Sequence, residues 1–360
     1  MNTKPNTNTH ESTQSKSPLK AKCIKLGIDV HADSYRVVRQ TDHASPQPAQ
    51  KFAPKDFLVW AKKQLTLADE VYSCYEAGPM GYGLHRDLEG MGVHNVVVRP
   101  QDWDELHKGV KTDKTDALAL VQRLSRYVGG NLKELAIVRV PTPEQELARS
   151  QSRQREQLMS HRLRLEAQGR SLLLFNGVRV QGRWWADKQW EQIPIRLPAP
   201  LVELLIVTRD LLLAVQKQLE AATTRLQSVA RPQPCGVGAL TSQVLEREVL
   251  DWHRFKNRRQ VASLTGMCPG VRSSGLKTYS GAITKHGNRR MRTALIELAW
   301  RCVRFQPEYP PLKRRLAVLR NTKATGAVKK KAIVAVGRRL AIDLWRLNTG
   351  RTTAEKLGLK

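Results

Sequence analysis

The sequence has few cysteines, no paired cysteine motif and no long apolar run. Its five cysteines are scattered, so we expect neither a zinc site nor a disulfide framework, and a reducing cytoplasm is the default location. Residues 1–18 are polar throughout, and we expect no signal peptide. Charged residues interrupt the most apolar run, Leu201 to Val215, which excludes it as a membrane span.

Acidic residues are scarce where basic residues are most abundant. The net charge is +29 and the pI about 10.4. Residues 251–360 hold 26 Lys and Arg against 5 Asp and Glu, a balance of +21, which leaves +8 for the first 250 residues. This excess predicts a polyanionic partner, most simply nucleic acid. Its uneven distribution favours a catalytic domain followed by segments that grip nucleic acid.

The length of 360 residues is enough for two or three domains. Residues 1–20 are rich in Asn, Thr, Ser and Lys and are predicted to be a disordered tail. The next hundred residues predict the order β-β-β-α-β-α-β-α. We expect strands over 23–30, 34–40, 51–53, 70–75 and 94–99, and helices from Pro54, over 79–91 and over 113–127.

Four acidic residues stand at comparable places in this pattern. Asp29 ends the first strand and Glu76 the fourth, while Asp113 and Asp116 project from one face of a helix. In a ribonuclease-H-like sheet the first and fourth strands are neighbours and the third helix crosses their ends, so the four carboxylates would converge. Such a cluster suits Mg²⁺ or Mn²⁺ and two-metal phosphodiester chemistry. For Asp113 and Asp116 alone, an acidic first turn that complements the helix dipole is the alternative.

Two long helices are expected over 145–175 and 201–229, with apolar residues at heptad-like spacing. An antiparallel hairpin, an inter-subunit coiled coil and a plain helical core all fit this spacing. A boundary follows at Arg231–Pro234. The Gly236-Val237-Gly238 turn would bring backbone amides to a phosphate, as in a helix-hairpin-helix, or is an ordinary interhelical turn.

A second chemical stretch runs from Val271 to Arg292. Its Ser273-Ser274-Gly275 loop would expose a hydroxyl among cations, where a serine could attack a phosphodiester and hold it covalently. The alternative is a phosphate-gripping loop whose serines only donate hydrogen bonds. The basic tail is expected to be a helix packed on the domain, with a solvated basic face as the alternative. Candidate nucleic-acid contacts are Lys111, Lys114, Gly236, Gly238, Lys277, Lys285, Arg289, Arg290 and Arg292.

With these motifs in place, the chain resembles the DEDD transposases of insertion sequence family 110, the bridge-RNA-guided recombinases. The matching pieces are GIDVH with Asp29, YEAGPMGYGLHR with Glu76, KTDKTDA with Asp113 and Asp116, and the later Ser273-Ser274-Gly275 and GAITKHGNRRMR blocks. The resemblance covers roughly residues 22 to 310. A long polar N-terminal tail and a basic extension beyond residue 310 depart from the family pattern.

The resemblance implies a RuvC-like domain that binds divalent metal through the four carboxylates, and a later domain with a nucleophilic serine. By motif position this is Ser274, with Ser273 as its neighbouring alternative. It also implies donor and target DNA, a structured guide RNA, a dimer or tetramer, and action in the bacterial cytoplasm at the nucleoid.

The expected architecture is α/β followed by mainly helical domains. The expected segments are a tail (1–21), a RuvC-like domain (22–142), a helical coiled-coil linker (143–231), a transposase domain (232–310) and a basic helical extension (311–360). A RuvC-type junction nuclease without a serine step and a non-catalytic nucleic-acid-binding protein are the competing functions.

Overall fold

The structure is a computed structural model that describes residues 20–100, 113–229, 234–275 and 277–360. The predicted tail over 1–20 lies outside this range except for its last residue. The chain divides into two compact units, Met1–Val140 and Pro141–Lys360, and each is described by itself. No helix of the described residues is both long and apolar enough to cross a membrane.

The first unit contains a five-stranded sheet in the order β3-β2-β1-β4-β5. β1 pairs with β4 in parallel, as does β4 with β5, whereas β2 pairs antiparallel with both β1 and β3. The predicted order of elements and the adjacency of the first and fourth strands are confirmed. The elements are β1 (Ala21–Val30), β2 (Tyr35–Thr41), β3 (Gln50–Phe52), α1 (Pro54–Leu67), β4 (Ala68–Glu76), α2 (Gly83–Met91), β5 (His94–Val98) and α3 (Asp113–Val128).

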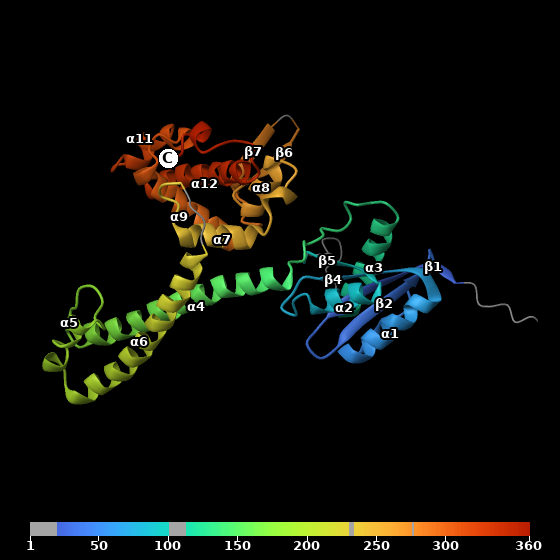
Figure 1. Ribbon diagram of the computed structural model, residues 1–360, viewed down its shortest axis with the longest axis horizontal. Coiled ribbons are helices and arrows are strands. Elements are labelled where there is room, and N and C mark those ends of the chain that lie inside the picture. Colours follow the sequence, from blue (N-terminus) through green and yellow to red (C-terminus); the bar gives the residue numbers. More distant parts are fainter. Residues whose placement is uncertain (1–19, 101–112, 230–233, 276) are drawn as a thin grey trace, which may run out of the picture. The chain divides into compact units, whose positions relative to one another are not determined.

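Helices cover both faces of this sheet (Figure 1). Alternate residues of the strands form one core with α1 and α2, including Ile28 of β1 and Tyr75 of β4. The intervening residues face α3, where Cys74 and Val98 pack with Leu120 and Val38 packs with Ala117. Because side chains alternate across a strand, these contacts assign every other residue of β1 and β4 either to the face covered by α1 and α2 or to the face covered by α3.

Gly27 allows α3 to lie directly against β1. A Cβ at this position would collide with the carbonyl oxygen of Ala117 and would lie 2.5 Å from the backbone nitrogen of Val121. Both are helix backbone atoms, so no side chain could yield to make room. The glycine therefore fixes how closely the start of α3 approaches the end of β1.

The second unit begins with two helices, α4 (Pro143–Phe175) and α6 (Ala199–Ser228), that run side by side (Figure 1). Thr142 and Gln145 form a capping box at the start of α4. Arg155 near its start contacts Thr223 near the end of α6, and Leu173 near its end shares a core with Leu205 near the start of α6. The helices are therefore antiparallel, and the hairpin forms within one chain.

The connection between α4 and α6 contains α5 (Asp187–Trp190) and η1 (Pro194–Arg196) and packs its tryptophans against the hairpin. The indole of Trp184 occupies the space where Gly169 of α4 would carry a Cβ. Its Nε1 donates a hydrogen bond to the carbonyl oxygen of Glu166, at 2.8 Å. This buried indole joins the connection to α4.

The rest of the second unit shares one hydrophobic core. Buried residues of α7, α8, α9 and α12 belong to it, as do Leu357 and Leu359 beyond α12. Residues from 232–310 and from 311–360 thus pack together, and the finer division predicted within 143–360 stays a prediction. The elements are α7 (Ala239–Val249), η2 (Trp252–Arg254), α8 (Arg258–Thr265), β6 (Pro269–Ser274), β7 (Lys277–Ile283), α9 (Arg289–Phe305), α10 (Pro310–Lys313), α11 (Leu316–Arg320), α12 (Gly326–Asn348) and η3 (Glu355–Leu357).

Candidate active site

Asp29 and Glu76 lie at the carboxyl ends of two neighbouring parallel strands. The pairing of β1 with β4 ends at Ile28 and Tyr75, so the next position places Asp29 level with Glu76. By alternation, Asp29 shares the face of Gly27 and Glu76 shares the face of Cys74, which is the face that α3 covers. Both carboxylates are half-buried. The structure thus brings together the first two acids of the predicted cluster.

The electrostatics of Cys74 agree with this placement. Burial and then the negative charge of Glu76 raise the pKa of the Cys74 thiol. The thiol lies 3.5 Å from the carbonyl oxygen of Leu120. The carboxylate of Glu76 therefore lies close enough for its charge to act on the Cys74 thiol.

Asp116, the last of the four acids along the chain, immediately precedes Ala117, the residue of α3 that lies against Gly27. It is half-buried, and it lies one helical turn before the buried Leu120, so it continues the stripe that faces the sheet. α3 begins at Asp113, whose side chain lies outside the described part. Among the side chains described, no three His, Cys, Asp or Glu residues are grouped so that they could hold a metal ion.

His31 is a site residue that the sequence did not single out. Its Nε2 lies 3.0 Å from Oδ2 of Asp29, with the imidazole 52% exposed and the carboxylate 20% exposed. The turn after β1 returns the chain to this position, since the backbone amide of His31 donates to the carbonyl oxygen of Ser34. His31 thus holds one oxygen of Asp29 from the solvent side.

The serine segment corrects one expectation. Ser273 and Ser274 are not in a loop but end β6, which pairs with β7 as an exposed two-stranded hairpin. Gly275 follows with φ +57°, a conformation that glycine adopts without strain. The sequence could have predicted this hairpin, because Gly275 lies between two short runs of residues that favour strands.

The register of the hairpin separates the two serines. Ser274 pairs with Lys277 and Ser273 with Thr278, and directly opposed residues share a face. Ser273 lies 3.3 Å from the Thr278 hydroxyl. Ser274 instead shares its face with Lys277. The next pair on that same face is Arg272 with Tyr279.

Some of the cationic residues predicted to contact nucleic acid are exposed, and others already bind partners within the fold. Lys277, Lys285 and Arg289 are exposed. Arg290 instead binds Glu156 at 2.5 Å, and Arg292 donates to the carbonyl oxygen of Thr265 at 3.0 Å, so these two arginines also hold the fold together. Lys111 and the side chain of Lys114 lie outside the described residues.

The Gly236–Gly238 turn precedes α7 and packs against α9. A Cβ on Gly236, whose φ is +86°, would lie 2.9 Å from Cβ of Phe305. A Cβ on Gly238 would lie 3.3 Å from the Arg301 guanidinium. These contacts favour the alternative of an interhelical turn over a turn that presents its amides to a phosphate.

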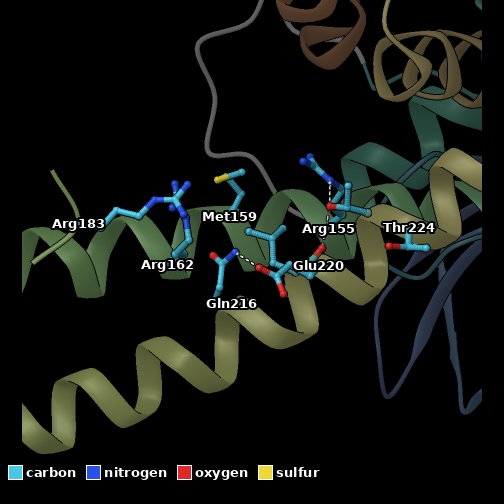
Figure 2. Close-up of a pocket in the computed structure, with 9 residues that line it drawn as sticks. Arg155, Met159, Arg162, Arg183, Gln216, Glu220 and Thr224 are labelled. Carbon is cyan, nitrogen blue, oxygen red and sulfur yellow. Dashed lines mark hydrogen bonds between the residues drawn. The ribbon is translucent and has the colours of Figure 1, made fainter. Parts of the chain in front are cut away.

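Three arginines and Glu220 line a hollow of about 310 Å³ between α4 and α6 (Figure 2). Arg155 and Arg162 come from α4, and Arg183 comes from the connection. Nε of Arg155 donates to the Thr223 hydroxyl at 2.8 Å, and burial lowers the pKa of this arginine. The heptad pattern did not reveal this cationic hollow, because it depends on how the two helices align.

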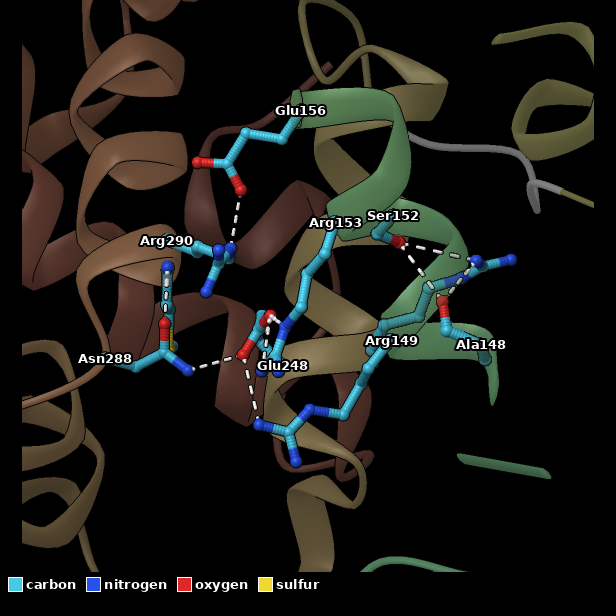
Figure 3. A network of polar contacts seen from close by, with 10 residues as sticks. Ala148, Arg149, Ser152, Arg153, Glu156, Glu248, Asn288 and Arg290 are labelled. Atoms are coloured by element: carbon cyan, nitrogen blue, oxygen red, sulfur yellow. Dashed lines mark hydrogen bonds and ion pairs between the residues drawn. The ribbon is translucent and has the colours of Figure 1, made fainter. Parts of the chain in front are cut away.

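A polar network joins α4 to the part of the unit that carries the β6–β7 hairpin (Figure 3). The side chain of Glu248 is 2% exposed and lies 3.5 Å from both Arg149 and Arg153. Asn288 caps α9 with its Oδ1 and donates from Nδ2 to Glu248 at 2.7 Å. Glu248 therefore connects α4, α7 and the start of α9.

Comparisons with known proteins give the family. A model of the transposase family IS116/IS110/IS902 matches residues 233–312, the part that contains the serine hairpin. A putative transposase, y4rJ, of Sinorhizobium fredii is 32% identical over 307 residues, which is 76% of each chain. The transposase for insertion sequence element IS1328 of Yersinia enterocolitica is 23% identical over 341 residues, 92% of this chain and 98% of that protein.

A third relative is the transposase for insertion sequence element IS1111A of Coxiella burnetii, 28% identical over 227 residues, 59% of this chain and 60% of that protein. The expected family and enzyme class are confirmed. The chain belongs to the IS116/IS110/IS902 family of transposases.

Proposed function

We propose that this transposase is an RNA-guided DNA recombinase that cuts and rejoins strands with a carboxylate-held metal and a covalent phosphoserine. The observation that carries this proposal is the placement of Asp29 and Glu76 level with one another, under the helix that begins with Asp113 and Asp116. In this proposal the first unit is a RuvC-like domain. The order of its sheet supports that assignment, as does the placement of β1, β4 and α3, the three elements that carry the acids.

The chemistry of the donors fits a divalent metal. Carboxylates are the hard oxygen ligands that Mg²⁺ and Mn²⁺ prefer, and a bound cation would offset the repulsion between Asp29 and Glu76. The ligands would be Asp29, Glu76, Asp113 and Asp116. Such a metal, when bound, stabilises charge on the oxygens of a phosphodiester under attack. His31 would keep one Asp29 oxygen oriented toward the solvent side of the site.

Ser274 would be the nucleophile. Its Oγ would lose its proton, attack phosphorus and form a phosphoserine ester while the scissile P–O bond breaks, and the released strand end would take up a proton as a 3′ or 5′ hydroxyl. Arg272 and Lys277 on the same face of the hairpin would bind the phosphate oxygens. Ser273 has no such cationic neighbours among its cross-strand partners, which supports Ser274 as the attacking residue.

The proposed partners are donor DNA, target DNA and a structured guide RNA, bound by a dimer or tetramer. The net charge of +29 supports nucleic-acid binding, and the sequence resemblance supports the guide RNA and the multimer. The exposed Lys277, Lys285 and Arg289 would contact phosphates. The α4–α6 hairpin would be the coiled-coil segment of the family.

The test combines purified protein, RNA transcribed from the flanks of its element, Mg²⁺ and end-labelled target DNA. We expect a protein–DNA adduct that protease removes, that persists in Ser273→Ala and that is absent in Ser274→Ala. Asp116→Asn should abolish cleavage while DNA binding persists. Cleavage without an adduct, unchanged by Ser274→Ala, would mean that water attacks and that the protein is a metal-dependent junction nuclease.

A further inference from the structure

Two adjoining hollows run along α12, at the base of the serine hairpin. The first, of about 600 Å³, is bounded by the base of the hairpin, including Pro269 and residues 280–283, and by Lys331 and Arg338 of α12. The second, of about 450 Å³, surrounds Asp343. Arg315 and Arg339 line both hollows, so the two adjoin, and together they are called here the α12 groove.

The α12 groove is strongly cationic. Asp343 is the one acid among the described residues that line it. This acid is 1% exposed and already binds Arg339 at 2.9 Å and Arg346 at 3.4 Å. The lining cations are Arg314, Arg315, Lys331, Arg338, Arg339, Arg346 and Lys356.

Asp343 orients two of these cations. The buried Tyr309 hydroxyl donates to its Oδ2 at 2.8 Å, and burial followed by the charge of Asp343 raises the pKa of Tyr309, so this hydroxyl stays a donor. Asp343 is thereby fixed, and Arg339 and Arg346 are held beside the groove with side chains 43% and 37% exposed.

Arg338 adds a further cation to the first hollow. Within the part of the chain that the structure describes, its Nε is buried and has no hydrogen-bond partner. It lies on the same face of α12 as Lys331, seven residues earlier, and both line the first hollow. Phosphate oxygens, like carboxylates, accept strong and often bidentate hydrogen bonds from guanidinium groups.

We propose that the α12 groove holds the phosphate backbone of the DNA strand that leads to Ser274. Lys331 and Arg346 are separated by about 22 Å along the helix, a length that spans about six or seven nucleotides at 3.4 Å each. The hairpin rises about 17 Å from Pro269 to Ser274. The groove therefore begins about five nucleotides from the attacking hydroxyl and gives the basic C-terminal segment a function.

A bulge at the base of the hairpin supports this geometry. The register changes between Pro269–Ile283 and Val271–Ser280, so Gly281 and Ala282 oppose Gly270. Bulges bend a strand pair and re-aim its end. The bent residues of β7 are the ones that line the groove, so one feature determines both the direction of Ser274 and the entrance of the groove.

The test measures how binding of uncut DNA depends on salt. Full-length wild type, Lys331→Gln/Arg338→Gln and the control Arg320→Gln/Lys330→Gln each bind a mixed-sequence 40-bp duplex across a series of salt concentrations. The control removes two exposed cations of α11 and α12 that do not line the groove. Each phosphate contact contributes about 0.9 to the slope of log K against log salt, so the groove variant should lose about 1.8.

A third variant, Lys331→Gln/Lys356→Gln, changes only exposed groove residues, so a folding defect at Arg338 cannot decide the result. A 40-nucleotide RNA is the parallel probe. Loss of slope with DNA in both groove variants, beyond the control, supports the proposal. Loss confined to RNA, or equal to that of the control, overturns it.

The inference rests on the proposed function only in naming the strand that leads to Ser274. The salt measurement uses uncut DNA and requires no adduct. A failure of the serine mechanism would therefore appear in the Ser274→Ala assay, whereas a failure of the groove would appear only in the slope.

Discussion

Glu248 and Glu156 provide a matched test of what holds α4 to the rest of the second unit. Both carboxylates bind arginines across elements, but the side chain of Glu248 is 2% exposed and that of Glu156 is 59% exposed. Glu248 binds Arg149, Arg153 and Asn288, whereas Glu156 pairs with Arg290. The proposed substitutions are Glu248→Gln and Glu156→Gln, which keep shape and remove charge.

The expected costs differ because burial differs. Hydrogen bonds to a charged group contribute about 1.5–3 kcal/mol, and the glutamine of Glu248→Gln can still accept from Asn288. The contacts to the partly exposed Arg149 and Arg153 are long, so we expect Glu248→Gln to lower the free energy of unfolding by about 2 kcal/mol. An exposed pair such as Glu156–Arg290 contributes about 0–1 kcal/mol.

Thermal unfolding of the full chain measures the difference. For a unit of this size, 1 kcal/mol shifts Tm by about 2–4 °C, so Glu248→Gln should lower the transition of the second unit by about 4–8 °C. Glu156→Gln should lower it by less than about 4 °C. An equal or smaller shift for Glu248→Gln than for Glu156→Gln would refute the reasoning that the buried network joins these elements.

Three further predictions follow from close contacts, hairpin register and burial. Gly27→Ala should lower the free energy of unfolding by about 1–3 kcal/mol and speed hydrogen exchange in β1 and α3, because its methyl meets helix backbone. Gly90→Ala, in α2 with open space around it, should not destabilise the unit or speed exchange, because alanine favours a helix over glycine. Arg272→Gln should reduce the protein–DNA adduct at least about tenfold by removing a charge-assisted phosphate contact, and an unchanged yield would contradict the face assigned to Ser274. Burial raises the pKa of the Cys302 thiol to about 11, so iodoacetamide at pH 8 should modify the exposed Cys235 first, and mass spectrometry showing equal labelling would contradict this.

The local pattern was sufficient to predict the elements of the first unit. The apolar runs of β1 and β5, Pro54 at the start of α1, and the periodicity of α3 are each properties of neighbouring residues, and the structure agrees with them. The family resemblance also required only short motifs. These features could be predicted because they depend on residues that are close in the chain.

Side-chain environments in the second unit could not be predicted in this way. No local pattern indicates that Glu248 meets Arg149, about 100 positions earlier, or that Arg292 binds a backbone carbonyl and does not remain free for phosphate. The expectation of a serine loop was wrong because the pairing of β6 with β7 decides the conformation of both serines. Cross-strand partners, and not the residue type, distinguish Ser274 from Ser273.

The sequence by itself determined the family, the order of elements, the positions of four acids and the excess of basic charge near the C-terminus. Tertiary structure alone decided that Asp29 and Glu76 share a face, that Gly27 admits α3 beside them, and that cations from α12 and the segment before it form one groove. The physical reason is that a carboxylate or guanidinium acquires its role from the charges and atoms around it. Those neighbours come from distant parts of the chain and meet only when the core forms.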